Sequence, residues 1–197
     1  VLKMIRSAHP EVVVSVDTFR SDIAKNAVYD YGVDIINDIS GGELDDQMFE
    51  VIAQVQVPYI MMHMKGTPQN MKEKAVYEDM MKEIMDYFSK KYDQLRSRGV
   101  NDIILDPGFG FAKNIDQNFV LMNQLDQFRI FDLPLLVGVS RKSMIFKTLG
   151  IRPDQALNGT TVLNTLAILS GADILRVHDV KAAKEVVQLV QKLQNTQ

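Results

Sequence analysis

Short apolar segments rich in Val, Ile and Leu recur along the chain without alternating with polar residues. Such runs are typical of strands buried on both faces, as in a parallel sheet. Between them, apolar residues recur every three or four positions, which indicates one face of a helix. We therefore predict an α/β fold of alternating strands and helices. The six predicted strands are residues 12–16, 34–37, 58–63, 102–105, 134–140 and 173–177.

The helical pattern is clearest over residues 77–95, 119–128 and 183–193, and residues 1–5 look like the end of an earlier helix. A glycine follows several of these segments and precedes a strand. At such a position a helix commonly ends in a left-handed residue, which glycine adopts without strain. We expect this conformation at Gly32, Gly99 and Gly171.

The spacing of the predicted strands narrows the choice of architecture within the α/β class. Successive strand ends lie about 32 residues apart, close to one βα unit of a TIM (β/α)8 barrel. A doubly wound open sheet is the alternative, but its first turn is usually glycine-rich, whereas residues 17–20 read Asp-Thr-Phe-Arg. We therefore predict a single barrel domain over residues 1–197 that holds the last six βα units. Its first two strands are absent, so we expect about 60 further residues upstream and an inactive protein without them.

Composition and charge exclude several classes of protein. With 22 basic and 25 acidic residues the net charge is −3 and the pI about 5.6, which argues against nucleic acid as a partner. No apolar run approaches the roughly 20 residues of a membrane helix, so no membrane is expected. The chain has no cysteine, hence no disulfide and no thiolate metal site, which fits a reducing compartment.

Each predicted strand ends in a polar or ionisable residue. In a parallel barrel these carboxyl ends meet on one face, where barrel active sites lie. The simpler interpretation is that such residues only cap strands and start helices, but six in succession with both signs of charge favour a site. The residues are Asp17, Asn37, His63, Asp106, Ser140 and His178.

The segment that follows the fourth strand, Asp-Pro-Gly-Phe-Gly-Phe-Ala-Lys over residues 106–113, carries the most information. A carboxylate at this strand tip can accept two N–H donors from a planar heterocycle such as an aminopyrimidinone. Alternatively, Asp106 only ties the turn to its own backbone. Phe109 and Phe111 either belong to the core or form an aromatic wall. His63, which lies among methionines, is more simply explained by packing than by catalysis.

A second chemical signal is a pair of basic segments. Residues 138–143, Gly-Val-Ser-Arg-Lys-Ser, place two cations at a strand-to-helix turn. Arg176 and His178 are two residues apart on a strand and should face the same side. Together with Lys142 they suggest a pocket for phosphate or pyrophosphate, although a solvated basic turn is the simpler alternative.

Taken together, these motifs resemble the dihydropteroate synthase family in order and spacing over the whole chain. The resemblance rests on Asp-Pro-Gly-Phe-Gly-Phe, Ser-Arg-Lys-Ser (residues 140–143) and Arg-Val-His-Asp (residues 176–179). It implies a transferase of folate synthesis that joins 6-hydroxymethyl-7,8-dihydropterin pyrophosphate to p-aminobenzoate, giving 7,8-dihydropteroate and pyrophosphate. It also implies Mg²⁺ on the diphosphate, inhibition by sulfonamides, a cytoplasmic location and a homodimer.

The resemblance also assigns roles to individual residues. It gives catalytic roles to Asp17, Asp106 and Lys142, which would stabilise the developing pterin cation and the leaving group. The family's metal-linked Asn would lie upstream of Val1, so no metal ligand is expected in this chain. The pterin positions are Asp17, Asn37, Met62, Asp106 and Lys142; the pyrophosphate positions are Arg141, Arg176 and His178; the p-aminobenzoate positions are Phe111 and Ser143.

One departure and two alternatives accompany the resemblance. Ala112 stands where the family commonly has Gly, which we expect to be tolerated if its φ is negative. A methyltransferase domain acting on methyltetrahydrofolate would share the pterin carboxylate and asparagine but need no pyrophosphate pocket. A barrel that binds pterin without catalysis is the second alternative. For the dimer, the apolar helix expected over residues 158–170, with small Gly159, Thr160 and Ala167, is the predicted contact.

Overall fold

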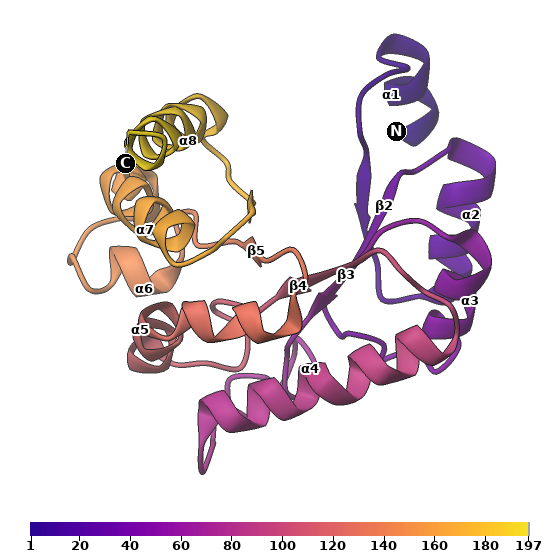
Figure 1. Cartoon of the computed structure of the whole chain (residues 1–197), viewed down its shortest axis with the longest axis horizontal. Helices are drawn as coiled ribbons and strands as arrows, with labels where there is room; N and C mark the ends of the chain where they lie inside the picture. Colours follow the sequence, from indigo (N-terminus) through magenta and orange to yellow (C-terminus); the bar gives the residue numbers. More distant parts are fainter. Residues whose placement is uncertain (197) are drawn as a thin grey trace.

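The computed structural model describes residues 1–196 and contains six parallel strands in chain order, with helices along the outer side of the row (Figure 1). A bridge between Leu105 and Leu135 joins the first four strands to the last two. Within the described chain β1 and β6 are not paired with each other, so the row is open. The strands are β1 (Ser15–Asp17), β2 (Ile35–Asp38), β3 (Tyr59–Met62), β4 (Ile103–Asp106), β5 (Leu136–Val137) and β6 (Ile174–Leu175).

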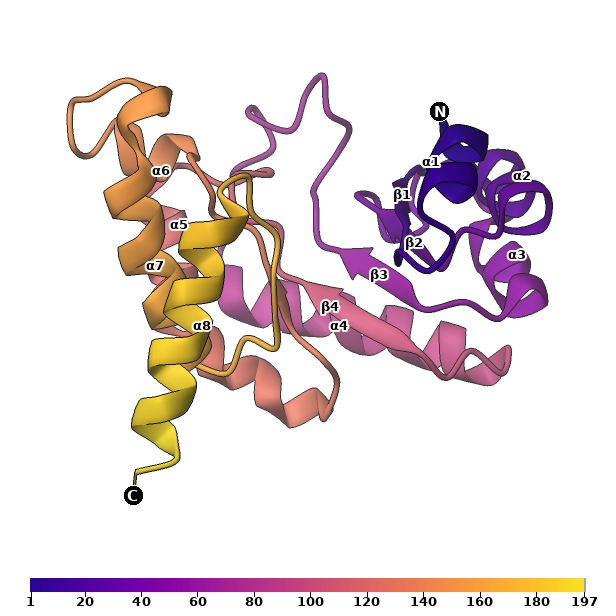
Figure 2. The same cartoon turned by 90° about the horizontal axis from the view of Figure 1, so that it is seen from above.

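Eight α-helices connect and flank these strands in the described chain. Helices α1 to α3 gather at one end of the row, and α7 and α8 lie side by side at the other (Figure 2). The helices are α1 (Leu2–Ala8), α2 (Ser21–Tyr31), α3 (Met48–Val55), α4 (Met80–Ser97), α5 (Ile115–Asn123), α6 (Ser143–Phe146), α7 (Leu157–Leu169) and α8 (Val180–Gln194), with 3₁₀ turns at Leu125–Phe131 and Pro153–Gln155.

The strand residues contribute to two separate cores because successive side chains point to opposite faces. Tyr59 and Ile103 pack toward the helices in the main core, whereas Ile60, Ile104 and Leu136 form a small cluster on the inner side. Both sides of the sheet are therefore apolar, which explains the runs without alternation.

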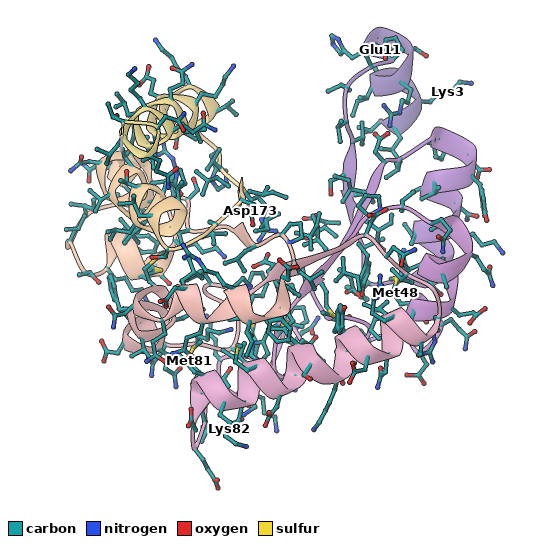
Figure 3. All side chains as sticks on the ribbon, viewed as in Figure 1. Lys3, Glu11, Met48, Met81, Lys82 and Asp173 are labelled. Atoms are coloured by element: carbon teal, nitrogen blue, oxygen red, sulfur yellow. The ribbon has the colours of Figure 1, made fainter. Side chains whose placement is uncertain are left out.

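The helices follow the amphipathic pattern that the sequence predicts. In Figure 3 the buried side chains of Met48 and Met81 lie on the inner side of their helices, whereas Lys3, Glu11 and Lys82 point away from the protein. None of the helices in residues 1–196 is both long and apolar enough to cross a membrane.

The six predicted strands and the α/β class are confirmed, with some differences in bounds. Strands β5 and β6 have two residues each, shorter than expected. The pattern over residues 119–128 spans the end of α5 and a 3₁₀ turn rather than one helix. Gly32, Gly99 and Gly171 all have positive φ, as predicted.

Candidate functional site

The alternation of side chains along the strands brings the predicted site residues together. Asn37, Met62 and Asp106 each lie two positions beyond an inner-facing isoleucine, so they too face inward at the carboxyl end of the sheet. Asn37 Nδ2 donates a hydrogen bond to Asp17 Oδ1 at 2.8 Å. Neighbouring strand tips are therefore connected by their own polar side chains.

Asp106 is the centre of this arrangement. Its side chain is fully buried, and a buried carboxylate must find donors to offset its lost hydration. Oδ1 accepts from the backbone N–H of Gly108 at 2.8 Å, and Oδ2 accepts from Arg176 Nη2 at 2.6 Å. Arg176 Nη1 also lies 3.4 Å from Asn37 Oδ1. Asp106 thus secures its own turn with one oxygen and presents the other to a planar N–H donor.

Lys142 contacts the turn that follows β4. Its ammonium group donates to the carbonyl of Phe109 and lies 5.0 Å from the ring centre of Phe111, a cation–π distance. Burial lowers the pKa of Lys142 to about 8, against the opposing effect of Asp106. Phe109 is fully buried and belongs to the core, whereas Phe111 is half-buried and borders the site.

The remaining predicted residues lie near the β5 and β6 ends with different partners. Arg141 forms a bidentate ion pair with Asp179, at 2.8 Å from Nε and 2.7 Å from Nη2. His178 Nδ1 lies 2.9 Å from Ser140 Oγ. Ser143, the first residue of α6, is half-buried. Arg176 therefore reaches Asn37 and Asp106, while His178 stays beside Ser140.

A buried network that the sequence analysis missed fixes the turn after β2. Asp38 is fully buried and accepts from Ser40 N at 2.8 Å, from Gly42 N at 2.8 Å and from the Tyr59 hydroxyl at 2.7 Å. Because Asp38 directly follows Asn37, its anchoring holds that asparagine in place. The signal in the sequence was an Asp followed within four residues by two glycines.

The turn after β4 requires glycine at its first bend. Gly108 has φ +72°, and a Cβ there would lie 2.1 Å from the carbonyl oxygen of His63. The condition set for Ala112 is not met, because its φ is +47°. The chain bends back here so that the Ala112 carbonyl accepts from the Tyr77 hydroxyl at 2.8 Å. A left-handed alanine costs about 1–2 kcal/mol, which these contacts must offset.

Lys113 is the second group that the sequence analysis missed. Although it ends the same motif, it was given no role. Its side chain is buried and its ammonium nitrogen lies 3.0 Å from Nδ1 of His63. His63 is itself buried and packs edge-on against Tyr87, with ring centres 5.0 Å apart, so the packing interpretation of His63 agrees with its position.

A family model described as "Pterin binding enzyme" matches residues 1–178. The chain belongs to this family. It is 41% identical to the dihydropteroate synthase of Synechocystis over 187 residues, which cover 93% of this chain and 64% of the relative. The chain thus spans slightly less than two thirds of that relative's length.

Solved structures show the same fold. The Yersinia pestis dihydropteroate synthase with a sulfonamide drug complex has a TM-score of 0.94 and 34% identity, covering 100% of this chain and 71% of that one. The Thermus thermophilus dihydropteroate synthase in complex with 4-aminobenzoate has a TM-score of 0.92 and 34% identity, covering 98% and 74%. The chain therefore has the architecture of the TIM-barrel family predicted from its sequence.

The described residues do not fit a metal ion held by the protein alone. No three His, Asp or Glu side chains in residues 1–196 lie close enough together to form such a site. We therefore derive no step through Mg²⁺ from this part of the chain.

Replacing Gly108 by alanine should both strain the turn and disturb the site. Gly108→Ala would place a Cβ against the His63 carbonyl in addition to the cost of about 1–2 kcal/mol for the left-handed backbone. The matched control is Gly99→Ala, where φ is +80° but no atom lies within 4 Å. Urea unfolding should show the larger loss for Gly108→Ala; equal losses would contradict the close approach.

Proposed function

We propose that the protein of this chain is a dihydropteroate synthase. It joins 6-hydroxymethyl-7,8-dihydropterin pyrophosphate to p-aminobenzoate and releases pyrophosphate. The observation that carries the proposal is the inward-facing Asp106 carboxylate, which already accepts an N–H of a guanidinium. The 2-amino group and the adjacent ring N–H of a pterin form a similar planar donor edge, so the same oxygen can accept from it.

In the proposed reaction, the bond between the pterin methylene carbon and the diphosphate oxygen lengthens as pyrophosphate leaves. Positive charge develops on the pterin, where the carboxylates of Asp17 and Asp106 stabilise it. Arg176, His178 and Lys142 stabilise the negative charge on the leaving group. The amine nitrogen of p-aminobenzoate then attacks the methylene carbon and loses a proton, so no covalent enzyme intermediate is needed.

The position of Arg176 adds a condition to this scheme. Its guanidinium contacts Asp106 and Asn37, the side chains assigned to the pterin. Pterin binding must therefore displace it from Asp106, which frees its charge for the diphosphate. Gly138 makes this route possible, since a Cβ there would lie 2.9 Å from Arg176 Nη2.

Mg²⁺ on the diphosphate, competition by sulfonamides and a cytoplasmic location belong to the same proposal. Their support is the family resemblance, together with the sulfonamide complex of the Yersinia pestis protein. When bound, the cation would neutralise part of the diphosphate charge. Phe111 and Ser143 remain the proposed contacts of p-aminobenzoate.

A homodimer through α7 is also part of the proposal. Val162, Leu166 and Leu169 are 51%, 45% and 46% exposed and support an apolar contact. The small residues expected to allow close approach serve this chain's own packing instead. A Cβ on Gly159 would meet Ile145 at 2.4 Å, and Thr160 is buried.

Asp106→Asn should abolish tight pterin binding, because an amide presents only one acceptor atom to replace two carboxylate oxygens. Losing a charge-assisted hydrogen bond should weaken affinity by more than about tenfold. Calorimetry on the full-length protein measures this, with Asp102→Asn, an exposed aspartate at the start of β4, as the control. Unchanged pterin affinity would rule out the assignment.

Arg176→Lys should affect binding of the diphosphate part of the substrate but not binding of the pterin part. We expect the pterin diphosphate to bind at least about tenfold more weakly, because a bidentate donor becomes a point charge. Free 6-hydroxymethylpterin should bind as well as before, since Asp106 no longer has to release a guanidinium. Arg152→Lys, at an exposed arginine, is the control. Equal losses for both ligands, or preferential binding of methyltetrahydrofolate, would favour the methyltransferase alternative.

Leu166→Glu should convert a dimer into a monomer, because it would place a charge in the apolar contact. Light scattering at micromolar concentration should give twice the chain mass for the unmodified protein. Ile130→Glu, at an exposed isoleucine outside α7, should remain dimeric. A monomeric unmodified protein would contradict the proposed contact.

A further inference from the structure

Lys113 connects the turn after β4 to the end of β3. Its Nζ atom lies 3.0 Å from His63 Nδ1, 3.2 Å from the Gly108 carbonyl and 3.1 Å from the Phe111 carbonyl. The two carbonyls belong to the turn that carries Phe109 and Phe111. Only 8% of Lys113 is exposed, so its ammonium group makes hydrogen bonds to these protein atoms in place of water.

The number of acceptors indicates the protonation states in this arrangement. An ammonium group has three N–H donors and no acceptor, which matches the three partners of Lys113. His63 Nδ1 must then accept, so the imidazole is neutral with its proton on Nε2. Burial, and then the charge of Lys113, hold the pKa of His63 well below its usual value, in agreement with this assignment.

We propose that Lys113, with neutral His63 as one of its acceptors, is a positioning residue that holds Phe111 at the p-aminobenzoate side of the site. This inference rests on the proposed function. Lys113 itself touches no substrate position; it acts through the Gly108 and Phe111 carbonyls. The Phe111 ring, in turn, lies against the Lys142 ammonium group.

The proposal implies a specific pH dependence. Burial lowers the pKa of Lys113 to about 7, with Asp106 raising it and Lys142 lowering it. The charged groups facing the pair are therefore Asp106 on β4, Lys142 before α6 and Lys65 after β3. Above about pH 7 Lys113 becomes an amine with two donors, so one acceptor loses its partner and the turn is held less firmly.

As pH rises above about 7, the free energy of unfolding should increase, although the turn is held less firmly. The pKa of Lys113 is lower in the folded protein than in the unfolded chain, where it is near 10.5. The unfolded state therefore binds more protons between about pH 7 and 10.5, and the free energy of unfolding attributable to Lys113 rises over that range. A loss of positioning that accompanies a gain in stability distinguishes this role from a merely structural one.

The test compares Lys113→Met with Lys72→Met, an exposed lysine on the preceding loop, in the full-length protein. Steady-state kinetics from about pH 6 to 9 should give a KM for p-aminobenzoate about tenfold higher in Lys113→Met, with pterin affinity little changed. The rise of this KM with pH around 7 should be present in the unmodified protein and absent in Lys113→Met, which keeps only the change near pH 8 caused by deprotonation of Lys142. Lys113→Arg, which keeps the charge, should recover part of the effect.

A second, spectroscopic experiment uses the unmodified protein, so its result depends neither on whether a variant folds nor on the proposed reaction. With ¹³Cε-labelled lysine, the Lys113 signal of the unmodified protein should titrate near pH 7 while the His63 ring signals shift with it. A Lys113 that titrates near 10 would overturn the inference. So would a Lys113→Met variant in which pterin affinity falls as much as the KM for p-aminobenzoate rises. If no dihydropteroate forms but the Lys113 signal titrates near pH 7 and the His63 ring signals shift with it, the proposed function fails and the contact between Lys113 and His63 stands.

Discussion

The ion pair between Asp106 and Arg176 is the interaction on which the site depends. Strand β6 has two residues and pairs only with β5 in the described chain, yet Arg176 reaches from its end across the inner side to β4. The carboxylate is completely buried, so removing the arginine would leave a charge with only the Gly108 N–H as donor. Such a pair adds little net stability, but it connects the end of β6 to the end of β4 across the inner side of the sheet.

The alternation of residues along the strands explains why the ligands of this site could be predicted. Once Ile35, Ile60 and Ile104 face inward, the residue two positions further must do so as well. Asn37, Met62 and Asp106 are those residues. The placement of Asn37 and Asp106 at strand ends followed from the apolar pattern and the parallel order of the strands. Met62 came only from the family resemblance, because the pattern put His63 at the end of that strand.

The contacts that the sequence did not reveal are those made within turns. Lys113 follows a glycine-rich segment and was given no role, because its burial depends on the turn folding back over β3. The positive φ of Ala112 could not be foreseen, since nothing local signals that Tyr77, 35 residues away, will bind its carbonyl. Asp38 lies next to Asn37. Only the fold shows that Asn37 faces the site and that Asp38 accepts from the Tyr59 hydroxyl.

Two lysines hold the turn after β4 from different sides. Lys142 donates to the Phe109 carbonyl, and Lys113 donates to the carbonyls of Gly108 and Phe111. These carbonyls have no strand partner. The Gly108 carbonyl also accepts from the Phe111 backbone N–H at 3.0 Å, and the two lysines supply the side-chain donors. Burial lowers the pKa of both lysines, to about 8 and about 7 respectively. The conformation of the turn beside Asp106 therefore depends on protons whose release favours the folded state while loosening the turn itself.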